Sequence, residues 1–323
     1  MDKKVIIAGF GTAAMSAIIA LRNSGFNGEI LVFNAQDNAR PYSPVLLPYF
    51  VSEKMSEEEI YTFGESEIEE LHINLHAGEA VLSVDADAHK ITTDASDYSY
   101  DKLLLCTGSS ANVEHINAAC GCADFNVLRL RNLDDARLAK ERLNAENCHR
   151  VLICGSSMIA LKCVEMCLDM NKEVNVLMRS EQIFKSCTVE EASSFIEGEL
   201  TKKGVEFIKE CGADSIEISD DKYCMEFSNG YKDQFEEIIV AQGVKDNIEW
   251  FTCGCSDDKQ SKTNEFMQTE EADIYAAGDI ACSRNLLQNT VQKFGLYKTA
   301  ALQGKIAGIN IAAELSDTNQ KLQ

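Results

Sequence analysis

Apolar and polar positions along this chain form blocks that recur in a regular order. The first block, residues 5–21, begins with a short apolar run, passes through a glycine-containing turn, and ends in a run with the apolar spacing of a helix. Residues 29–34 are again a short apolar run. This order is typical of a β-α-β unit, in which a helix joins two parallel strands.

Short alternating apolar and polar runs follow between residues 75 and 110, separated by turn-forming residues. They predict a small antiparallel sheet that closes with an apolar strand at 103–105. The same plan then begins again and ends near residue 243. Its predicted elements are a helix at 133–145, a β-α-β unit within 150–180, a helix at 190–204 and strands within 205–218 and 222–243. Because chance rarely reproduces a whole order of elements, we infer an internal repeat.

The last part of the chain returns to the strand pattern. Residues 269–283 contain a strand that ends in the Ala-Ala-Gly-Asp run at 276–279, and residues 288–315 predict one long helix rich in small residues. The whole pattern predicts an α/β fold with two Rossmann-like domains, each a parallel sheet with helices plus a small antiparallel sheet. We assign residues 1–110 and 242–323 to the first domain, and residues 111–241 to a second domain inserted into it.

Composition narrows the classes of function. The chain has 323 residues, enough for two domains, and 45% of them are hydrophobic, as in a globular protein. Its 30 basic and 52 acidic residues give a net charge of −22, which argues against nucleic acid as a partner. No apolar run approaches the ~20 residues of a membrane span. Thirteen cysteines without a signal-peptide pattern predict a cytoplasmic protein with mostly free thiols.

The first glycine turn carries the clearest chemical signal. Gly9, Gly11 and Ala14 complete a G-x-G-x-x-[GA] pattern between the predicted strand and helix, and Thr12 and Ala13 lie within it. The first glycine permits a tight turn, the second lets the backbone approach a pyrophosphate, and the third position lets helix and strand pack closely. The helix N-terminus would face the phosphates. Taken alone, the pattern is equally compatible with a buried strand followed by an ordinary glycine loop.

Four further segments, in order, make the chain resemble the FAD-dependent pyridine nucleotide-disulfide oxidoreductase superfamily over nearly its whole length. Residues 100–108 match the family's YDxLxxATG segment, a second fingerprint begins at Gly155, residues 241–247 match AxGxxPN with Asp246 in place of proline, and residues 274–279 match IYAAGD. The run 40–42 and the helix around 303–310 look like the nitrite-, rubredoxin- and ferredoxin-reductase branch.

The resemblance implies two sets of cofactor contacts, while no catalytic residue or metal ligand is assigned. FAD contacts are implied at Gly9, Gly11, Thr12, Ala13, Ala14, Asn34, Arg40, Val81, Thr107, Gly108, Gly278 and Asp279. NAD(P) contacts are implied at Gly155, Ser156, Ser157, Met158, Ile159, Arg179, Gln242 and Gly243. Asn34 stands at the position where an acid usually binds a ribose hydroxyl, so we expect its contribution to ribose binding to be weaker than that of an acid. Without the other motifs, Asp279 would read as the N-cap of a helix.

The nicotinamide fingerprint departs from the family pattern. Ser157 replaces the second glycine, Met178 replaces the acid at the strand end, and Lys162 replaces a glutamate common in the family. Loss of the acid together with Arg179 would suit the 2′-phosphate of NADPH. The equally compatible alternative is a domain that no longer binds a nicotinamide well.

The segment 40–50 holds all three prolines of the chain and no cysteine. The prolines predict a stiff, non-helical path. The absence of cysteine excludes disulfide exchange at the family's usual place, because that chemistry requires a thiolate. Tyr42 and Tyr49 flank the prolines, and either flavin contact or simple loop packing accounts for them. The chain stops soon after the last helix, so we expect no C-terminal interface domain.

Two Cys-x-Cys units, Cys120–Cys122 and Cys253–Cys255, fall in predicted loops. Four thiolates could bind a metal or a cluster, but the spacing is unlike the common Cys-x-x-Cys arrangement. We therefore predict ordinary free thiols. Cys163 and Cys167 lie one helical turn apart and are predicted to be core residues.

These features predict a FAD-dependent oxidoreductase that moves electrons from NADH or NADPH through the flavin to a redox partner protein or subunit, without a disulfide intermediate. One alternative is an electron-relay or structural flavoprotein subunit with a degenerate nicotinamide site. Another is a flavin enzyme that reduces a small organic substrate directly.

Overall fold

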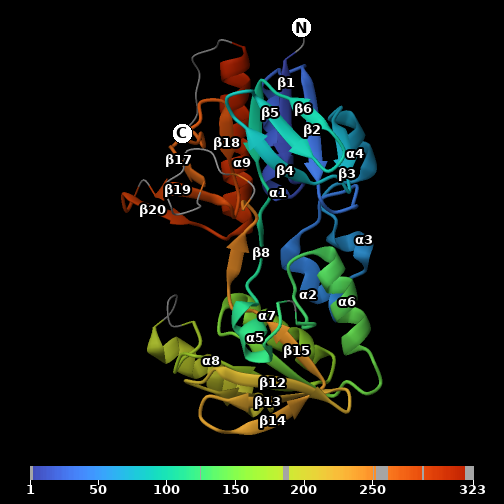
Figure 1. Cartoon of the computed structure of the whole chain (residues 1–323), viewed down its shortest axis with the longest axis vertical. Coiled ribbons are helices and arrows are strands. Elements are labelled where there is room, and N and C mark those ends of the chain that lie inside the picture. Colours follow the sequence, from blue (N-terminus) through green and yellow to red (C-terminus); the bar gives the residue numbers. More distant parts are fainter. Residues whose placement is uncertain are drawn as a thin grey trace. The chain divides into compact units, whose positions relative to one another are not determined.

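The computed structural model of the chain describes residues 3–123, 125–184, 189–249, 251, 261–285 and 287–316. The chain divides into two compact units, each drawn in Figure 1. The first unit comprises Met1–Ser43, Tyr61–Ser109 and Asp246–Gln323. The second comprises Pro44–Ile60 and Ser110–Lys245. Two short strands, β8 (Ser109–Ala111) and β16 (Val244–Asp246), pair with each other where the chain passes between the units.

The first unit is built on a five-stranded parallel sheet. Its strands, in spatial order, are β18 (Ile274–Ala276), β7 (Lys102–Leu105), β1 (Lys4–Ala8), β2 (Glu29–Asn34) and β3 (Asn74–Ala77). Val5 of β1 is in register with Ile30 on one side and with Lys102 on the other. The apolar residues of β1 are fully buried because both faces of the sheet are covered.

Helices α1 (Thr12–Asn23) and α9 (Tyr297–Leu315) pack side by side against one face of this sheet (Figure 1). Their contact is close because Gly304 and Gly308 of α9 lie directly on the α1 backbone. A Cβ atom at Gly304 would overlap the carbonyl oxygen of Ala13, and one at Gly308 would overlap that of Ala17. The small residues of the last helix are therefore explained by this packing.

Antiparallel strands complete the first unit. Strands β4 (Val81–Asp85), β5 (Lys90–Thr93) and β6 (Asp97–Ser99) form one sheet, whose Ile91 packs in the core on the other face of the parallel sheet. A second small sheet contains β17 (Ser261–Thr263), β19 (Ala281–Asn285) and β20 (Thr290–Lys293), and a short helix, α4, spans Glu65–Glu70.

The second unit repeats this plan. Its parallel sheet has the order β11 (Glu206–Ile208), β10 (Glu173–Leu177), β9 (Arg150–Cys154) and β15 (Glu237–Val240). Its antiparallel sheet contains β12 (Ala213–Ser219), β13 (Lys222–Phe227) and β14 (Lys232–Phe235). Its helical elements are η1 (Pro44–Leu46), α2 (Leu47–Val51), α3 (Glu57–Ile60), α5 (Glu114–Cys120), α6 (Leu133–Leu143), α7 (Met158–Asp169) and α8 (Glu190–Lys202). The predicted α/β class with two repeated parallel sheets is confirmed.

Two local predictions are wrong. The single helix predicted over 288–315 begins only at Tyr297, because residues 290–293 pair as β20 with β19 instead. The proline segment is not free of helix: it contains η1 and α2. Pro48 fits because it lies in the first turn of α2, where its missing N–H costs no helical hydrogen bond.

The segment 44–60 also differs from the predicted division, which assigned it to the first domain. Here α2 packs against α6 and α7 of the second unit. Two ion pairs support this placement: Lys140 with Glu53 at 3.2 Å, and Lys54 with Asp169 at 2.5 Å. These contacts join positions far apart in the sequence, so periodicity within the segment carried no signal of them.

Candidate dinucleotide sites

The first glycine turn connects β1 to α1 and leaves the start of the helix open. Gly9 has a φ of 99°, and a Cβ atom there would overlap the backbone of Cys106, so only glycine fits. Gly11 is the exposed N-cap residue of α1, with no side chain capping the helix. A Cβ atom added to Gly11 would meet nothing within 4 Å. The start of the helix is therefore unobstructed above Gly11, and the first N–H groups of a helix have no partner within the helix, as an anion site requires.

The order of strands places this turn at a switch point of the sheet. From β1 the chain goes to β2 on one side, and it later returns to β7 on the other side. Ligands of open α/β sheets bind at such points, beyond the carboxyl ends of the strands. Thr107 and Gly108 follow β7, while Gly278 and Asp279 follow β18, so four more predicted residues lie at the same edge.

Thr107 and Gly108 are held by one asparagine. Thr107 Oγ1 donates to the carbonyl oxygen of Asn247 at 2.6 Å, and Asn247 Nδ2 donates back to that of Thr107 at 3.0 Å. The Asn247 N–H also donates to the carbonyl oxygen of Gly108, whose φ is 67°. The turn after β7 is therefore fixed in its unusual conformation.

Asp279 is half-buried, and its Oδ2 accepts a hydrogen bond from Ser109 Oγ at 2.8 Å. The element that follows it is strand β19, so the alternative of a helix N-cap does not apply. Its carboxylate is thus oriented by the first residue of β8.

Gln303 was missed as a site residue and supports the Gly278 turn. Its Oε1 accepts from the Gly278 N–H at 2.9 Å, and its Nε2 donates to Ser283 Oγ at 2.9 Å. Gln303 is only 4% exposed. The available sequence signal was a polar residue among the small residues of the predicted last helix.

Three predicted contacts, Asn34, Arg40 and Val81, interact with their own surroundings. Asn34 is buried at the end of β2, and its Nδ2 lies 3.2 Å from Asn38 Oδ1. The Arg40 guanidinium lies 4.1 Å from the centre of the Tyr61 ring. Val81 is half-buried at the start of β4. Asn34 ends β2, the neighbour of β1, so it lies at the same edge of the sheet as the α1 turn.

The second glycine turn, between β9 and α7, also has a glycine with positive φ, but a side chain caps its helix start. Gly155 has a φ of 138°, and a Cβ atom there would overlap the carbonyl oxygen of Ala241. Ser157 is the N-cap residue, and its Oγ accepts from the Ala160 N–H at 3.4 Å. The serine side chain thus uses one donor that would otherwise face a phosphate. Met158 and Ile159, both exposed, begin α7.

The strand end beside this turn lacks a ribose-binding acid. Met178 is 1% exposed and packs with Ile183 and Phe184. Ser156 Oγ lies 3.3 Å from Ser180 Oγ. Among the residues predicted to contact NAD(P), only the exposed Arg179 carries a charge.

Arg179 and Gln242 line a pocket of approximately 280 Å³ within the second unit. Arg179 Nη1 lies 3.1 Å from His115 Nε2, and Asp214 also lines the pocket. Gln242 Oε1 is buried and has no hydrogen-bond partner within the described part of the chain. Neither His115 nor Asp214 was predicted, because they come from α5 and β12 and belong to no motif. Exposed Gly243 follows Gln242.

Lys162, at the family's glutamate position, bonds within the second unit. Its Nζ donates to Glu165 Oε2 at 2.7 Å and to the Tyr49 hydroxyl at 2.9 Å. The hydrogen bond to Glu165, and to a smaller extent the one to Tyr49, raises the pKa of Lys162. The Lys162 amino group is therefore held in place by two hydrogen bonds.

The cysteines divide into two groups. Cys163 and Cys167 are fully buried, which confirms them as core residues, and burial raises the pKa of Cys163 to about 12. The prediction of free thiols is wrong for Cys120 and Cys122, which form a disulfide. The second Cys-x-Cys unit, Cys253–Cys255, lies outside the described residues.

Two parallel sheets in one chain, each with a glycine turn at a helix start, define a protein with two dinucleotide-binding folds. Residues 3–304 match the family model described as pyridine nucleotide-disulphide oxidoreductase, so the chain belongs to that family. The predicted resemblance is confirmed, and with it the class of flavin- and NAD(P)H-dependent oxidoreductases.

The chain is similar to several characterised proteins. It is 26% identical over 312 residues to the assimilatory nitrate reductase electron transfer subunit of Bacillus subtilis (strain 168), covering 96% of this chain and 39% of that one. It is 26% identical over 313 residues to rubredoxin-NAD(+) reductase of Pseudomonas putida, covering 95% and 79%. Among solved structures, the covalent putidaredoxin reductase–putidaredoxin complex matches with a TM-score of 0.87 and 23% identity, covering 99% and 77%. None of the described helices is long and apolar enough to cross a bilayer.

Proposed function

We propose that the protein binds FAD at the β1–α1 turn and passes electrons from NADH or NADPH to a redox partner protein or subunit. The observation that carries this proposal is the open start of α1. Gly11 begins the helix in open space at the switch point of the sheet, and Asp279 follows β18 at the same edge. When bound, FAD supplies the chemistry of taking up electrons as a pair and releasing them singly or in pairs.

The chain's own residues would bind and orient the cofactor. The first-turn N–H groups of α1 hold a pyrophosphate, since a helix N-terminus favours negative charge. Asp279, oriented by Ser109, accepts hydrogen bonds from hydroxyl groups of the cofactor. Gln303 keeps the Gly278 turn in place. The segment 40–50 has no cysteine, so a disulfide intermediate at that position is not part of the proposal.

The first experiment fills the space above Gly11. The backbone there, with φ −102° and ψ −165°, is open to any residue, so Gly11→Val leaves the fold intact and blocks the pyrophosphate. We expect FAD affinity to fall more than about tenfold, or about 1.4 kcal/mol. Gly198→Val is the matched control, because Gly198 in α8 also has nothing within 4 Å of an added Cβ. A wild-type protein that takes up no FAD would refute the proposal.

A second candidate function is an electron-relay subunit that holds FAD but does not use a nicotinamide. The Ser157 cap on α7 and the buried Met178 favour it, because both remove features that bind a nicotinamide dinucleotide. Stopped-flow reduction of the bound flavin separates the two functions. Rapid bleaching by NADH or NADPH supports the reductase, while no bleaching by either supports the relay subunit.

The partner and the location complete the proposal. The names of two relatives, an electron transfer subunit and a rubredoxin reductase, support a redox protein as acceptor. The cytoplasm is the proposed location, because eight cysteines in the described ranges are unpaired and nearly all of them are buried. Co-purification from the native host would identify the acceptor.

A further inference from the structure

The disulfide between Cys120 and Cys122 closes the end of helix α5. Gly121 between them is the C-cap residue in the left-handed conformation, with a φ of 68°. This turn brings the two Cα atoms to 5.5 Å, within the range of about 4.4–6.8 Å that a disulfide needs. Sequence spacing alone did not reveal the pair, because it depends on a conformation that glycine adopts readily.

Cys122 is more exposed than any of the eight unpaired cysteines that the structure describes. Cys122 is exposed and Cys120 is half-buried. Of the eight unpaired cysteines within the described ranges, seven are buried and Cys224 is half-buried. An exchange reagent therefore reaches Cys122 before any of these thiols.

This disulfide adds little to stability. A disulfide stabilises a fold mainly by removing entropy from the unfolded chain, and the effect grows with the length of the closed loop. Here the loop holds one intervening residue. A structural role as a covalent brace is therefore a poor explanation for the pair, and reversible chemistry is a better one.

The loop is held in place by contacts that do not need the disulfide. Asn117 Nδ2 donates to the carbonyl oxygen of Ala123 at 2.6 Å, and its Oδ1 accepts from the Phe125 N–H at 3.1 Å. Cys120 Sγ lies 3.2 Å from the carbonyl oxygen of Asn117, which can accept an S–H hydrogen bond from the reduced thiol. Both redox forms thus fit the same local structure.

We propose that Cys120 and Cys122 form a reversible dithiol–disulfide pair that exchanges with small aliphatic thiols. A thiolate attacks the exposed Cys122 Sγ, the bond between the two cysteines breaks, and Cys120 leaves as a thiolate and takes up a proton. A second thiol then attacks the mixed disulfide. It releases Cys122 as a thiol and the small-molecule disulfide as product, so the pair gains two electrons and two protons.

The test uses the full chain, with any bound flavin, in buffers of varied reduced and oxidised glutathione. After an acid quench, isotope-coded alkylation and mass spectrometry give the oxidised fraction of the peptide containing residues 120–122. We expect one two-electron transition. It is unchanged in Cys224→Ser and lost in Cys122→Ser, where Cys120 is found as a thiol or as a glutathione adduct.

Two results would overturn the proposal. In the first, both sulfurs of the peptide remain open to alkylation under fully oxidising buffer. In the second, the disulfide persists after excess dithiothreitol under native conditions. The wild-type titration decides the matter without a variant, and circular dichroism checks that both serine variants are folded.

Discussion

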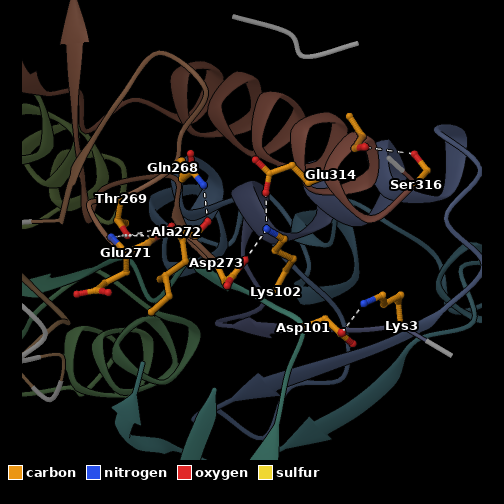
Figure 2. A network of polar contacts seen from close by, with 12 residues as sticks. Lys3, Asp101, Lys102, Gln268, Thr269, Glu271, Ala272, Asp273, Glu314 and Ser316 are labelled. Carbon is orange, nitrogen blue, oxygen red and sulfur yellow. Dashed lines mark hydrogen bonds and ion pairs between the residues drawn. The ribbon is translucent and has the colours of Figure 1, made fainter. Parts of the chain in front are cut away.

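Replacing Lys102 by methionine is expected to destabilise the first unit, because this lysine forms ion pairs with two carboxylates at the edge of the core. Lys102 opens β7, and Figure 2 shows its amino group between Asp273 and Glu314. The Nζ donates to Asp273 Oδ1 at 2.6 Å and also bonds Glu314 Oε2. The side chains of Lys102, Asp273 and Glu314 are 10%, 32% and 16% exposed, respectively. Methionine keeps the apolar stem and removes only the charge.

The expected magnitude follows from this burial. Breaking a fully buried pair by removing one partner costs about 3–5 kcal/mol, because the remaining charge stays uncompensated. Since Asp273 is one-third exposed, water screens part of this cost, and we expect a loss of about 2–4 kcal/mol for Lys102→Met. Burial alone would lower the pKa of Lys102, but its bonds to Asp273 and Glu314 raise it. Its stabilising contribution is thus complete below its unfolded pKa and is lost as pH rises through the folded pKa.

Urea unfolding followed by circular dichroism measures the loss. The matched control is Lys3→Met, since Lys3 pairs with Asp101 at 2.9 Å and the two side chains are 55% and 34% exposed (Figure 2). An exposed pair of this kind contributes under about 1 kcal/mol. Equal losses in the two variants would refute the argument from burial.

Further outcomes test the two turns and the acid stability of the second unit. Gln303→Leu leaves the buried Gly278 N–H without its acceptor, so we expect a loss of about 1–3 kcal/mol in thermal unfolding together with lower flavin content. Ser157→Gly opens the start of α7 at a stability cost of roughly a few tenths of a kcal/mol, and we expect faster flavin reduction by NADPH in stopped flow. Burial alone would raise the pKa of Asp233, but its bond to Arg150 lowers it. The stability that this pair contributes is therefore complete above the unfolded pKa of Asp233 and is lost as pH falls through the folded pKa. In Asp233→Asn, we expect the free energy of unfolding, measured in urea, to depend less on pH between about pH 5 and pH 2. An unchanged acid slope in that variant would contradict the assignment.

Motifs whose chemistry depends on neighbours in the chain were predictable. The turn of Gly9 and Gly11 and the strand end at Gly278 follow from local spacing, since a strand, a turn and a helix start are formed by consecutive residues. Residues that act through long-range contacts were not predictable. Gln303 reaches the Gly278 turn across 25 positions, and His115 meets Arg179 across 64. Apolar periodicity within a segment does not indicate which distant residues will be in contact.

Residue spacing and composition were enough to identify the family, the α/β class and the two glycine turns, because these depend on local backbone conformation and on apolar spacing. The difference between the two turns became visible only in the folded structure. It left the start of α1 open above Gly11, and it showed the Ser157 side chain capping α7. It also assigned the segment 44–60 to the second unit and joined Cys120 to Cys122. Open space, helix caps and cysteine pairing depend on which atoms come into contact after folding, and spacing along the chain does not specify those contacts.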